Sequence, residues 1–300
     1  CQPTVQVEQH GMGKPAALVL GASGQIGRFL VPRLRDAGWM VLAASRQPRM
    51  TQHPDVTWLQ GDLFSGLPTL PALDAIFSLG PLDGFARWLD SSHLHGTPQI
   101  VALGSMSALS KRQSSDPREG KLAQSLLDAE AGLQSAARSR GLAWTILRCT
   151  LIYGAGIDHS LSPIARIATK YRIFPRLPFA SGLRQPVHAC DLAGACLAAV
   201  GNAQVDGRIL AVGGAERLPF SSMLDRVIDS LQVKVLRVPL NPVAMRLGMG
   251  LARPFRPGGM PGPAFLARLS ADLVADDGPA RALLGWSPRG FAPDASTWTP

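Results

Sequence analysis

Apolar runs alternate with stretches of helical periodicity along the first half of the chain. The runs predict strands at 16–20, 39–44, 56–59, 75–79, 100–103 and 143–147. A helix over roughly 25–37 would contain Pro32 and end at Gly38. A longer helix over about 120–139 would bury a stripe of four side chains, namely Leu122, Leu126, Leu133 and Ala137. This alternation is typical of a doubly wound α/β domain, whose parallel sheet is covered by helices on both faces.

The second half of the chain has a weaker pattern. Its predicted elements are an alanine-rich helix at 192–200, a strand at 208–212, a helix at 220–231 and a strand at 233–238. A stretch rich in Arg, Pro, Gly and Met follows at 241–268. We therefore predict a flexible leader at 1–14 and a doubly wound domain at 15–153 that is completed by about 186–212. A smaller, interleaved C-terminal lobe would comprise 154–185 and 213–300.

The turn after the first strand carries the clearest chemical signal. Gly21, Gly24 and Gly27 are spaced three residues apart between the strand and the next helix. In such a turn the glycines allow a tight bend, close approach of the backbone to a pyrophosphate, and close packing of helix on strand. The helix N-terminus adds free N–H groups and a positive dipole end. Arg28 follows, where the loop of nucleotide triphosphatases has Lys. A dinucleotide is the predicted ligand, and a turn used for packing alone is the simpler alternative.

The end of the second predicted strand favours NADP over NAD. An NAD site usually has an acidic residue there, about 20 residues into the motif, that binds the ribose 2′-hydroxyl. This chain has Ser45 and Arg46 instead, and a guanidinium suits a 2′-phosphate because it forms charge-assisted, paired hydrogen bonds. If Arg46 and Arg49 are ordinary solvated charges, the preference between the two cofactors stays undecided.

Composition sets further limits. Hydrophobic residues make up 46% of the chain and charged residues 17%, and no apolar run reaches the length of a membrane-spanning helix. Three of the four cysteines, Cys149, Cys190 and Cys196, lie in apolar segments without the paired spacing of a metal site. We therefore expect no metal and a reducing, cytoplasmic setting. The net charge of +9 comes mostly from scattered Arg residues, which favours an anionic small molecule over nucleic acid.

Five segments, in order along the chain, resemble the short-chain dehydrogenase/reductase superfamily, specifically its extended or atypical branch of NAD(P)-dependent epimerase/dehydratase-like proteins. The segments are 21–27, 61–63, 147–154, 185–192 and 284–288. The resemblance spans about 15–288 and implies a Rossmann domain, a nicotinamide cofactor and a small-molecule substrate. Family members often pair through helices that correspond to about 82–94 and 122–139, so a homodimer is an expectation by analogy.

The resemblance also implies which residues contact the cofactor. Those around the pyrophosphate would be Gly21, Ala22, Ser23, Gly24, Gln25, Ile26 and Gly27. Those at the remaining groups would be Ser45 and Arg46 at the ribose phosphate, Asp62 and Leu63 at the adenine, Leu79 and Gly80 at the inner ribose, and Thr150, Leu151 and Ile152 beside the nicotinamide.

The acid/base chemistry departs from the family pattern. Family members use a Tyr, a Lys four residues later and a nearby Ser or Thr. The two tyrosines of this chain, Tyr153 and Tyr171, both lie away from the helix that follows the fifth strand. One alignment puts Pro117 and Lys121 at the Tyr and Lys positions. A second alignment, fixed on Glu130, puts Leu122 and Leu126 there.

Other side chains are therefore candidates for catalysis. Ser105 and Ser107 follow the fifth strand, and Lys121 lies in the next helix. A turn cap is the simpler interpretation of the two serines, and a solvated charge that of the lysine. His188 and Asp191 are more typical of a buried contact and a helix cap. A substrate diphosphate or a solvated surface would explain four basic residues equally well: Arg166, Arg172, Arg176 and Arg184.

Three functions remain open from the sequence. The first is an NAD(P)-dependent oxidoreductase or epimerase-like enzyme, favouring NADP, that acts on a carbonyl or nucleotide-sugar-like small molecule with non-standard acid/base groups. The second is a catalytically silent NADP-binding regulatory or assembly subunit. The third adds lipid contact through 243–249 and the Arg-rich turn after it. None of these requires an integral membrane segment.

Overall fold

The computed structural model describes residues 13–51, 53–64, 66–241 and 268–299, which form two compact units. The first unit contains the chain up to Gly104, together with 127–147 and 193–210. The second unit contains 105–126, 148–192 and the chain from Ala211 onwards. Most of the predicted leader and the whole of 243–249 lie outside the described residues.

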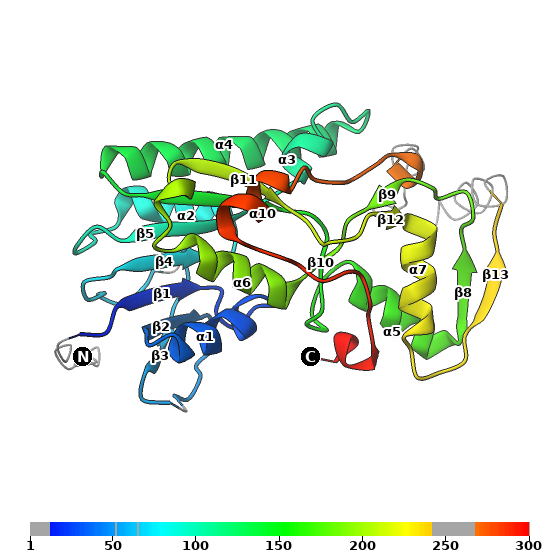
Figure 1. Cartoon of the computed structure of the whole chain (residues 1–300), viewed down its shortest axis with the longest axis horizontal. Helices are drawn as coiled ribbons and strands as arrows, with labels where there is room; N and C mark the ends of the chain where they lie inside the picture. The colour runs from blue at the N-terminus through cyan, green and yellow to red at the C-terminus, as the bar shows by residue number, and fades with distance from the viewer. Residues whose placement is uncertain (1–12, 52, 65, 242–267, 300) are drawn as a thin grey trace. The chain divides into compact units, whose positions relative to one another are not determined.

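A seven-stranded sheet organises the first unit, with strand order β11-β6-β5-β4-β1-β2-β3. The strands are β1 (Ala16–Leu20), β2 (Met40–Ser45), β3 (Val56–Gln60), β4 (Ala75–Ser78), β5 (Gln99–Ser105), β6 (Trp144–Cys149) and β11 (Arg208–Val212). Figure 1 shows β5, β4, β1, β2 and β3 side by side. β1 pairs in parallel with both β2 and β4. The chain order reverses between β1 and β4, and open α/β sheets bind ligands at the carboxyl ends of strands at such a point.

Apolar side chains on both faces bury these strands. Leu18, Ile76 and Ile100 pack in one cluster with α2 (Leu82–Ser91) and the later part of α4 (Pro117–Ser139). The intervening residues Val19 and Phe77 are buried as well, on the opposite face. Strands buried in this way read as continuous apolar runs. The predicted doubly wound α/β fold is therefore confirmed.

Helix α1 (Gly27–Asp36) follows β1, and Gly38 turns the chain into β2 with φ +86°. Pro32 lies inside the helix, as predicted. In α4 the predicted stripe was wrong at Leu122, which is 43% exposed. Leu133 and Ala137 are buried as predicted, whereas the first part of the helix buries Ala123, one residue on from Leu122, together with Glu130.

The second unit is built from short elements. They are α3 (Ser107–Ser110), β7 (Ile152–Tyr153), α5 (Leu161–Tyr171), β8 (Ile173–Arg176), β9 (Leu183–Arg184), β10 (Val187–His188), β12 (Leu218–Pro219), α7 (Phe220–Asp229), β13 (Leu236–Pro239), α10 (Gly278–Leu284) and η3 (Ala295–Trp298). Three two-stranded pairings join them: β7 with β10, β9 with β12 and β8 with β13. Helix α6 (Ala189–Ala199) begins in this unit and continues into the first, which also holds η1 (Ala203–Val205). No helix among the described residues is long and apolar enough to cross a membrane.

Candidate functional site

The turn between β1 and α1 depends on glycine at Gly21 and Gly27 and is tight at Gly24, where a Cβ would lie 3.1 Å from the Gly21 oxygen. Gly21 has φ +80°, and a Cβ there would lie 3.3 Å from the carbonyl carbon of Leu79. Gly24 donates its N–H to the Gly21 carbonyl at 2.9 Å. A Cβ on Gly27 would lie 2.4 Å from the Ala22 oxygen, closer than real Cβ contacts allow. Side chains at these positions would fill the turn, so its shape depends on glycine.

This turn presents hydrogen-bond donors to a ligand. Within the described residues, the backbone N–H groups of Ser23, Gln25 and Ile26 donate to no protein acceptor. Ile26 caps α1, so the positive end of the helix dipole lies at the same place. A pyrophosphate fits this donor set.

Two buried polar atoms of the first unit also lack a partner among the described residues, namely Oε1 of Gln25 and Oγ of Ser78. Buried polar atoms are normally satisfied, so each is open to a ligand or water. Gln25 is part of the predicted pyrophosphate site. Sequence reasoning missed Ser78, although a polar residue that ends a buried apolar strand was a usable signal.

Two arginines follow β2, and their contacts differ. Ser45 is buried, and its Oγ accepts the N–H of Gln47 at 3.3 Å. Arg46 is exposed and forms no ion pair with any described residue. Arg49 instead lies over the Trp58 ring at 5.2 Å, a cation–π contact. Arg46 is therefore the arginine that is free to bind a phosphate here.

The other predicted first-unit residues follow neighbouring strands. Asp62 comes after β3, and its Oδ1 accepts the N–H of Phe64 at 2.8 Å. Leu63 packs on the core. Leu79 continues the β4 pairing by donating its N–H to Leu20 at 3.0 Å, and Gly80 has open space where a Cβ would lie. The sheet thus brings the predicted pyrophosphate, adenine and ribose residues to the carboxyl ends of β1 to β4.

The predicted nicotinamide-side residues belong to the second unit. The hydroxyl of Thr150 donates to the carbonyl of Gln185, and its N–H donates to Val212 at 3.0 Å. Leu151 accepts the N–H of Val187 at 2.8 Å, and Ile152 pairs with the same residue in β10. These bonds hold residues 150–152 in a defined conformation.

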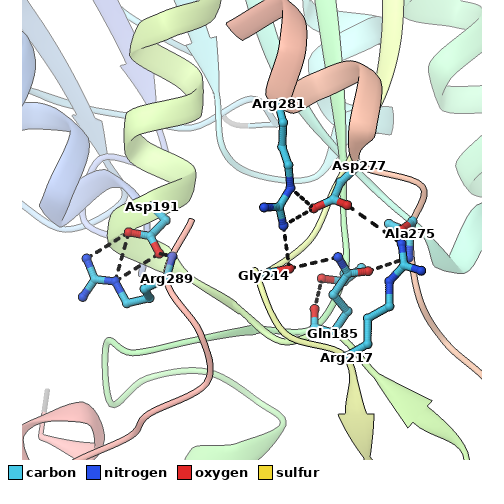
Figure 2. Close-up of polar contacts among 9 residues, drawn as sticks. Gln185, Asp191, Gly214, Arg217, Ala275, Asp277, Arg281 and Arg289 are labelled. Carbon is cyan, nitrogen blue, oxygen red and sulfur yellow. Dashed lines mark hydrogen bonds and ion pairs between the residues drawn. The ribbon is translucent and has the colours of Figure 1, made fainter. Parts of the chain in front are cut away.

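Gln185, whose backbone carbonyl accepts the Thr150 hydroxyl, also has a buried side-chain amide that bonds to two other segments (Figure 2). Gln185 is 2% exposed, and its Nε2 donates to Gly214 at 2.9 Å while its Oε1 accepts the N–H of Ala275 at 2.9 Å. Arg281 donates to the same Gly214 carbonyl at 3.2 Å and to Asp277 at 2.8 Å. One side chain therefore joins three segments of the second unit that are distant in sequence. Hydrophobic periodicity does not indicate that Gln185 links these segments.

The predicted catalytic serines form a turn. Ser105 ends β5, and its Oγ accepts the N–H of Ser107, the first residue of α3, at 3.2 Å. Met106 donates its N–H to the Cys149 carbonyl at 3.0 Å. Lys121 is exposed and forms no ion pair with the described residues. These contacts agree with the simpler interpretations, and the catalytic roles stay predictions.

Another lysine of the second unit lies in a more unusual environment. Glu119 is buried, and its carboxylate binds Arg268, accepts the Ser114 hydroxyl at 2.7 Å and lies 3.8 Å from the Lys111 amine. Burial, and to a smaller extent the nearby Arg268 charge, lowers the pKa of Lys111. The lysine backbone N–H donates to Ser107 at 3.2 Å. No pattern in the sequence indicates this cluster.

Tyr153 is a core residue. Its side chain is 1% exposed, its ring edges contact His188 at 5.0 Å and Phe291 at 4.9 Å, and its hydroxyl donates to Gly290 at 3.4 Å. Burial raises the pKa of Tyr153 to about 12. It is therefore unsuited to proton transfer near neutral pH.

Asp191 lies inside the first turn of α6, so the predicted helix cap was wrong. Its carboxylate accepts the N–H of Arg289 at 2.9 Å and the Arg289 Nε at 3.0 Å (Figure 2). This ion pair raises the pKa of Arg289.

The four arginines considered for a diphosphate differ. Arg184 is 5% exposed and donates to the carbonyls of Leu183, Ala271 and Arg268, so it holds the chain together. Arg176 pairs with Asp225. Arg166 and Arg172 are exposed, with no ion pair to a described residue. Among the same residues, His, Cys, Asp and Glu side chains form no group that could hold a metal.

Comparison with known sequences identifies the cofactor class. Residues 21–156 match the family model described as NAD(P)H-binding. Uncharacterised proteins of Mycobacterium tuberculosis and Mycobacterium bovis are each 24% identical over 249 residues, which is 81% of this chain and 24% of each relative. The chain spans about a quarter of the length of the curated relatives it matches.

Solved structures agree on the fold. MoeE5 in complex with UDP-glucuronic acid and NAD has a TM-score of 0.66 at 19% identity, covering 96% of this chain and 99% of its own. UDP-N-acetylglucosamine 4-epimerase from Bacillus cereus has a TM-score of 0.61 at 14% identity, covering 95% and 94%. An epimerase from Methanothermobacter thermautotrophicus has a TM-score of 0.68 at 13% identity, covering 95% and 90%. Residues 21–156 thus match an NAD(P)H-binding family model, and the chain shares the fold of MoeE5 and of the two epimerases, which agrees with the fold that the sequence resemblance implied.

Proposed function

We propose that the chain is an NADP-dependent oxidoreductase or epimerase-like enzyme that acts on a carbonyl or nucleotide-sugar-like small molecule. The observation that carries the proposal is the glycine turn after β1, whose free N–H groups at the start of α1 suit a pyrophosphate. The nucleotide sugars named with the similar structures support the substrate class by analogy of fold.

The preference for NADP rests on Arg46. Arg46 is exposed, follows the last residue of β2 and has no ionic partner among the described residues. Arg49, by contrast, forms a cation–π contact with Trp58. A guanidinium that is free before binding can pair with a 2′-phosphate without first breaking another contact.

A bound nicotinamide would supply hydride transfer. The chain would then have to hold the substrate carbonyl and move one proton. The proposed hydroxyls are those of Ser105 and Ser107, with Lys121 as the lysine that one family alignment selects. The structure adds Lys111 as a second candidate, because it lies one helical turn after Ser107 and its pKa is lowered.

Titration of NADPH and NADH into the protein, followed by tryptophan fluorescence, tests the cofactor part. We expect tighter binding of NADPH and a loss of about tenfold or more in NADPH affinity on Arg46→Ala, with little change for NADH. Arg49→Ala is the matched control and should have the smaller effect. Equal affinity for both cofactors in the parent protein would contradict the preference for NADP.

Turnover tests the enzyme part. NADPH oxidation should be measured on a panel of aldehydes, ketones and UDP-linked 4-keto sugars. Loss of a positioned proton donor costs about two to four powers of ten in rate, so Ser105→Ala, Ser107→Ala and Lys111→Ala should separate the acting group from the others. Tight NADPH binding without turnover on the whole panel would contradict the enzyme and favour the silent NADP-binding subunit.

The missing Tyr is the observation that favours that second function. Leu122, at the Tyr position of one alignment, is 43% exposed, and the buried Tyr153 does not replace it. The remaining expectations, a homodimer, no binding of nucleic acid and a cytoplasmic location, stay proposals.

A further inference from the structure

We propose that one face of the second unit docks on a membrane surface that carries anionic lipids. The α5–β8–β13 face, as we name it, is defined by Ile167, Tyr171, Ile173, Leu236 and Val238. Their exposed fractions are 53%, 62%, 48%, 65% and 37%, respectively. Single exposed apolar residues are ordinary on protein surfaces, but a group of them on adjoining elements marks an interaction site.

The register of β8 and β13 gathers apolar residues on one side. Leu236 lies opposite Ile173, and Val238 lies opposite Pro175. Since side chains alternate along a strand, these four share one side of the two-stranded sheet, and all four are exposed.

The other side of this sheet is occupied by α7. Phe174 packs in a cluster with Leu224, and Arg237 binds both Asp225 and Asp229. Figure 1 shows α7 beside β8. The apolar side of the sheet therefore lies on the side away from α7.

Helix α5 adds exposed apolar residues next to this sheet, since it contacts β8. Its inward residues Leu161, Ala165 and Ala168 are buried, whereas Ile167 and Tyr171 lie one turn apart on the opposite, exposed side. The chain leaves α5 at Arg172 in the left-handed conformation, with φ +57°. The N–H of Leu236 bonds the Arg172 carbonyl at 2.8 Å, so β13 begins where α5 ends.

Basic side chains around the α5–β8–β13 face favour an anionic partner. Arg166 and Lys170 on α5, Arg172 just after it and Lys234 just before β13 are exposed, and none forms an ion pair with a described residue. Lys170 lies over the Tyr171 ring at 5.3 Å. The sequence has no Asp or Glu between Asp158 and Asp191 or between Asp229 and Asn241. The carboxylates of Asp225 and Asp229 on α7 are paired with Arg176 and Arg237.

An anionic bilayer matches each of these features. Branched side chains and a Tyr can enter the interfacial region, while Lys and Arg extend their ammonium and guanidinium groups to lipid phosphates. A protein partner would have to present an acidic rim around an apolar centre. Attraction to anionic lipid also weakens with salt.

Vesicle flotation with the full chain tests this proposal. We expect binding to vesicles of phosphatidylcholine mixed with phosphatidylglycerol to exceed binding to phosphatidylcholine alone by about tenfold, and to fall at high salt. Leu236→Ser and Lys234→Glu should each reduce it. The matched controls are Leu109→Ser, since Leu109 is 45% exposed on α3, and Arg118→Gln, at an exposed position of α4. Both controls should bind like the parent.

Thermal unfolding and NADPH titration of each variant separate docking from folding and from the cofactor site. The substituted side chains are exposed, so the midpoint of unfolding and the NADPH affinity should stay unchanged. Equal binding to both kinds of vesicle, or to neither, would overturn the proposal. A dimer in sedimentation equilibrium that Leu236→Ser dissociates would overturn it too, because the face would then join two copies.

Discussion

The two units of the chain are stabilised in different ways. The first is a sheet whose strands are buried on both faces by continuous apolar runs, and its large cluster joins β1, β4 and β5 to α2 and α4. In the second, two small apolar clusters lie around Tyr153 and Leu177, and buried polar side chains such as Gln185 and Arg184 bond to backbone carbonyls of distant segments.

This difference in stabilisation explains why the sequence predicts the first unit better than the second. Apolar periodicity is local, so it predicts strands and the turn between them. A bond between Gln185 and the backbone near Gly214 or Ala275 leaves no pattern in sequence. The cofactor turn lies in the first unit, whose strands the apolar pattern predicts. The predicted catalytic residues lie in the second unit, within 105–126 and 148–192, where bonds between distant residues leave no such pattern.

The largest expected effect is on the turn itself. Gly27→Ala would place a Cβ 2.4 to 2.5 Å from three backbone atoms of Ala22. We expect it to lower the free energy of unfolding by about 3 kcal/mol. NADPH affinity should fall by about a hundredfold, because the N–H groups that face the phosphates would move. Urea denaturation and fluorescence titration measure the two effects.

Gly120→Ala is the control for this substitution. Gly120 lies in α4, where an added Cβ would have no neighbour within 4 Å, so alanine there should be neutral or stabilising by up to about 1 kcal/mol. A Gly27→Ala protein that binds NADPH as tightly as the parent would contradict the description of the turn.

The next effect probes the polar links of the second unit. Gln185→Leu leaves the Ala275 N–H without its bond in a buried place and leaves the Gly214 carbonyl with only the longer bond from Arg281. We expect a loss of about 2 kcal/mol in the free energy of unfolding, measured by urea denaturation. Gln204→Leu, at an exposed residue of η1, should cost far less. If both cost the same, polar links do not stabilise this unit.

Particular residues show how far prediction reached. The strands, α1 and the dinucleotide turn were predicted because each depends on neighbours in sequence. Leu122 was misplaced because the buried face of α4 is set by Ala123 and Glu130, which an apolar pattern underrates. The cap predicted at Asp191 was wrong, and its ion pair with Arg289 was not predictable because the two residues are distant in sequence. The lowered pKa of Lys111 could not be predicted from the sequence, because it depends on burial and on the charge of Arg268, which is distant in sequence.

A smaller effect concerns Tyr153 at alkaline pH. Its pKa is raised from 10.0 to about 12, so the folded state holds the proton more tightly than the unfolded state. Stability from this group is fully present below pH 10 and is lost as pH rises towards 12. We expect this loss to be about 1 to 2 kcal/mol. It should shrink in Tyr153→Phe but not in Tyr171→Phe, whose side chain is 62% exposed. Unfolding midpoints across this range measure it.

The same variant tests whether Tyr153 takes part in catalysis. At neutral pH, Tyr153→Phe removes the hydroxyl's bonds to the backbone at Gly290, 3.4 Å long, and at Ala292, and turnover should be retained. A fall in rate by about two powers of ten, with stability unchanged, would contradict its assignment to the core.

The smallest effect compares two ion pairs. The Arg289 side chain is half exposed, yet it meets Asp191 through its Nε, its backbone N–H and its terminal amine, and the Asp191 side chain is 11% exposed. Arg87 and Asp83, one turn apart in α2, are both mostly exposed and share a single bond. Paired bonds to a shielded carboxylate hold better than a single bond in water. We therefore expect about 1 kcal/mol from Arg289→Gln and about 0.3 kcal/mol from Arg87→Gln in urea denaturation. Equal losses would mean that the polar links of the second unit act no differently from ordinary surface pairs, and would remove the contrast between the two units.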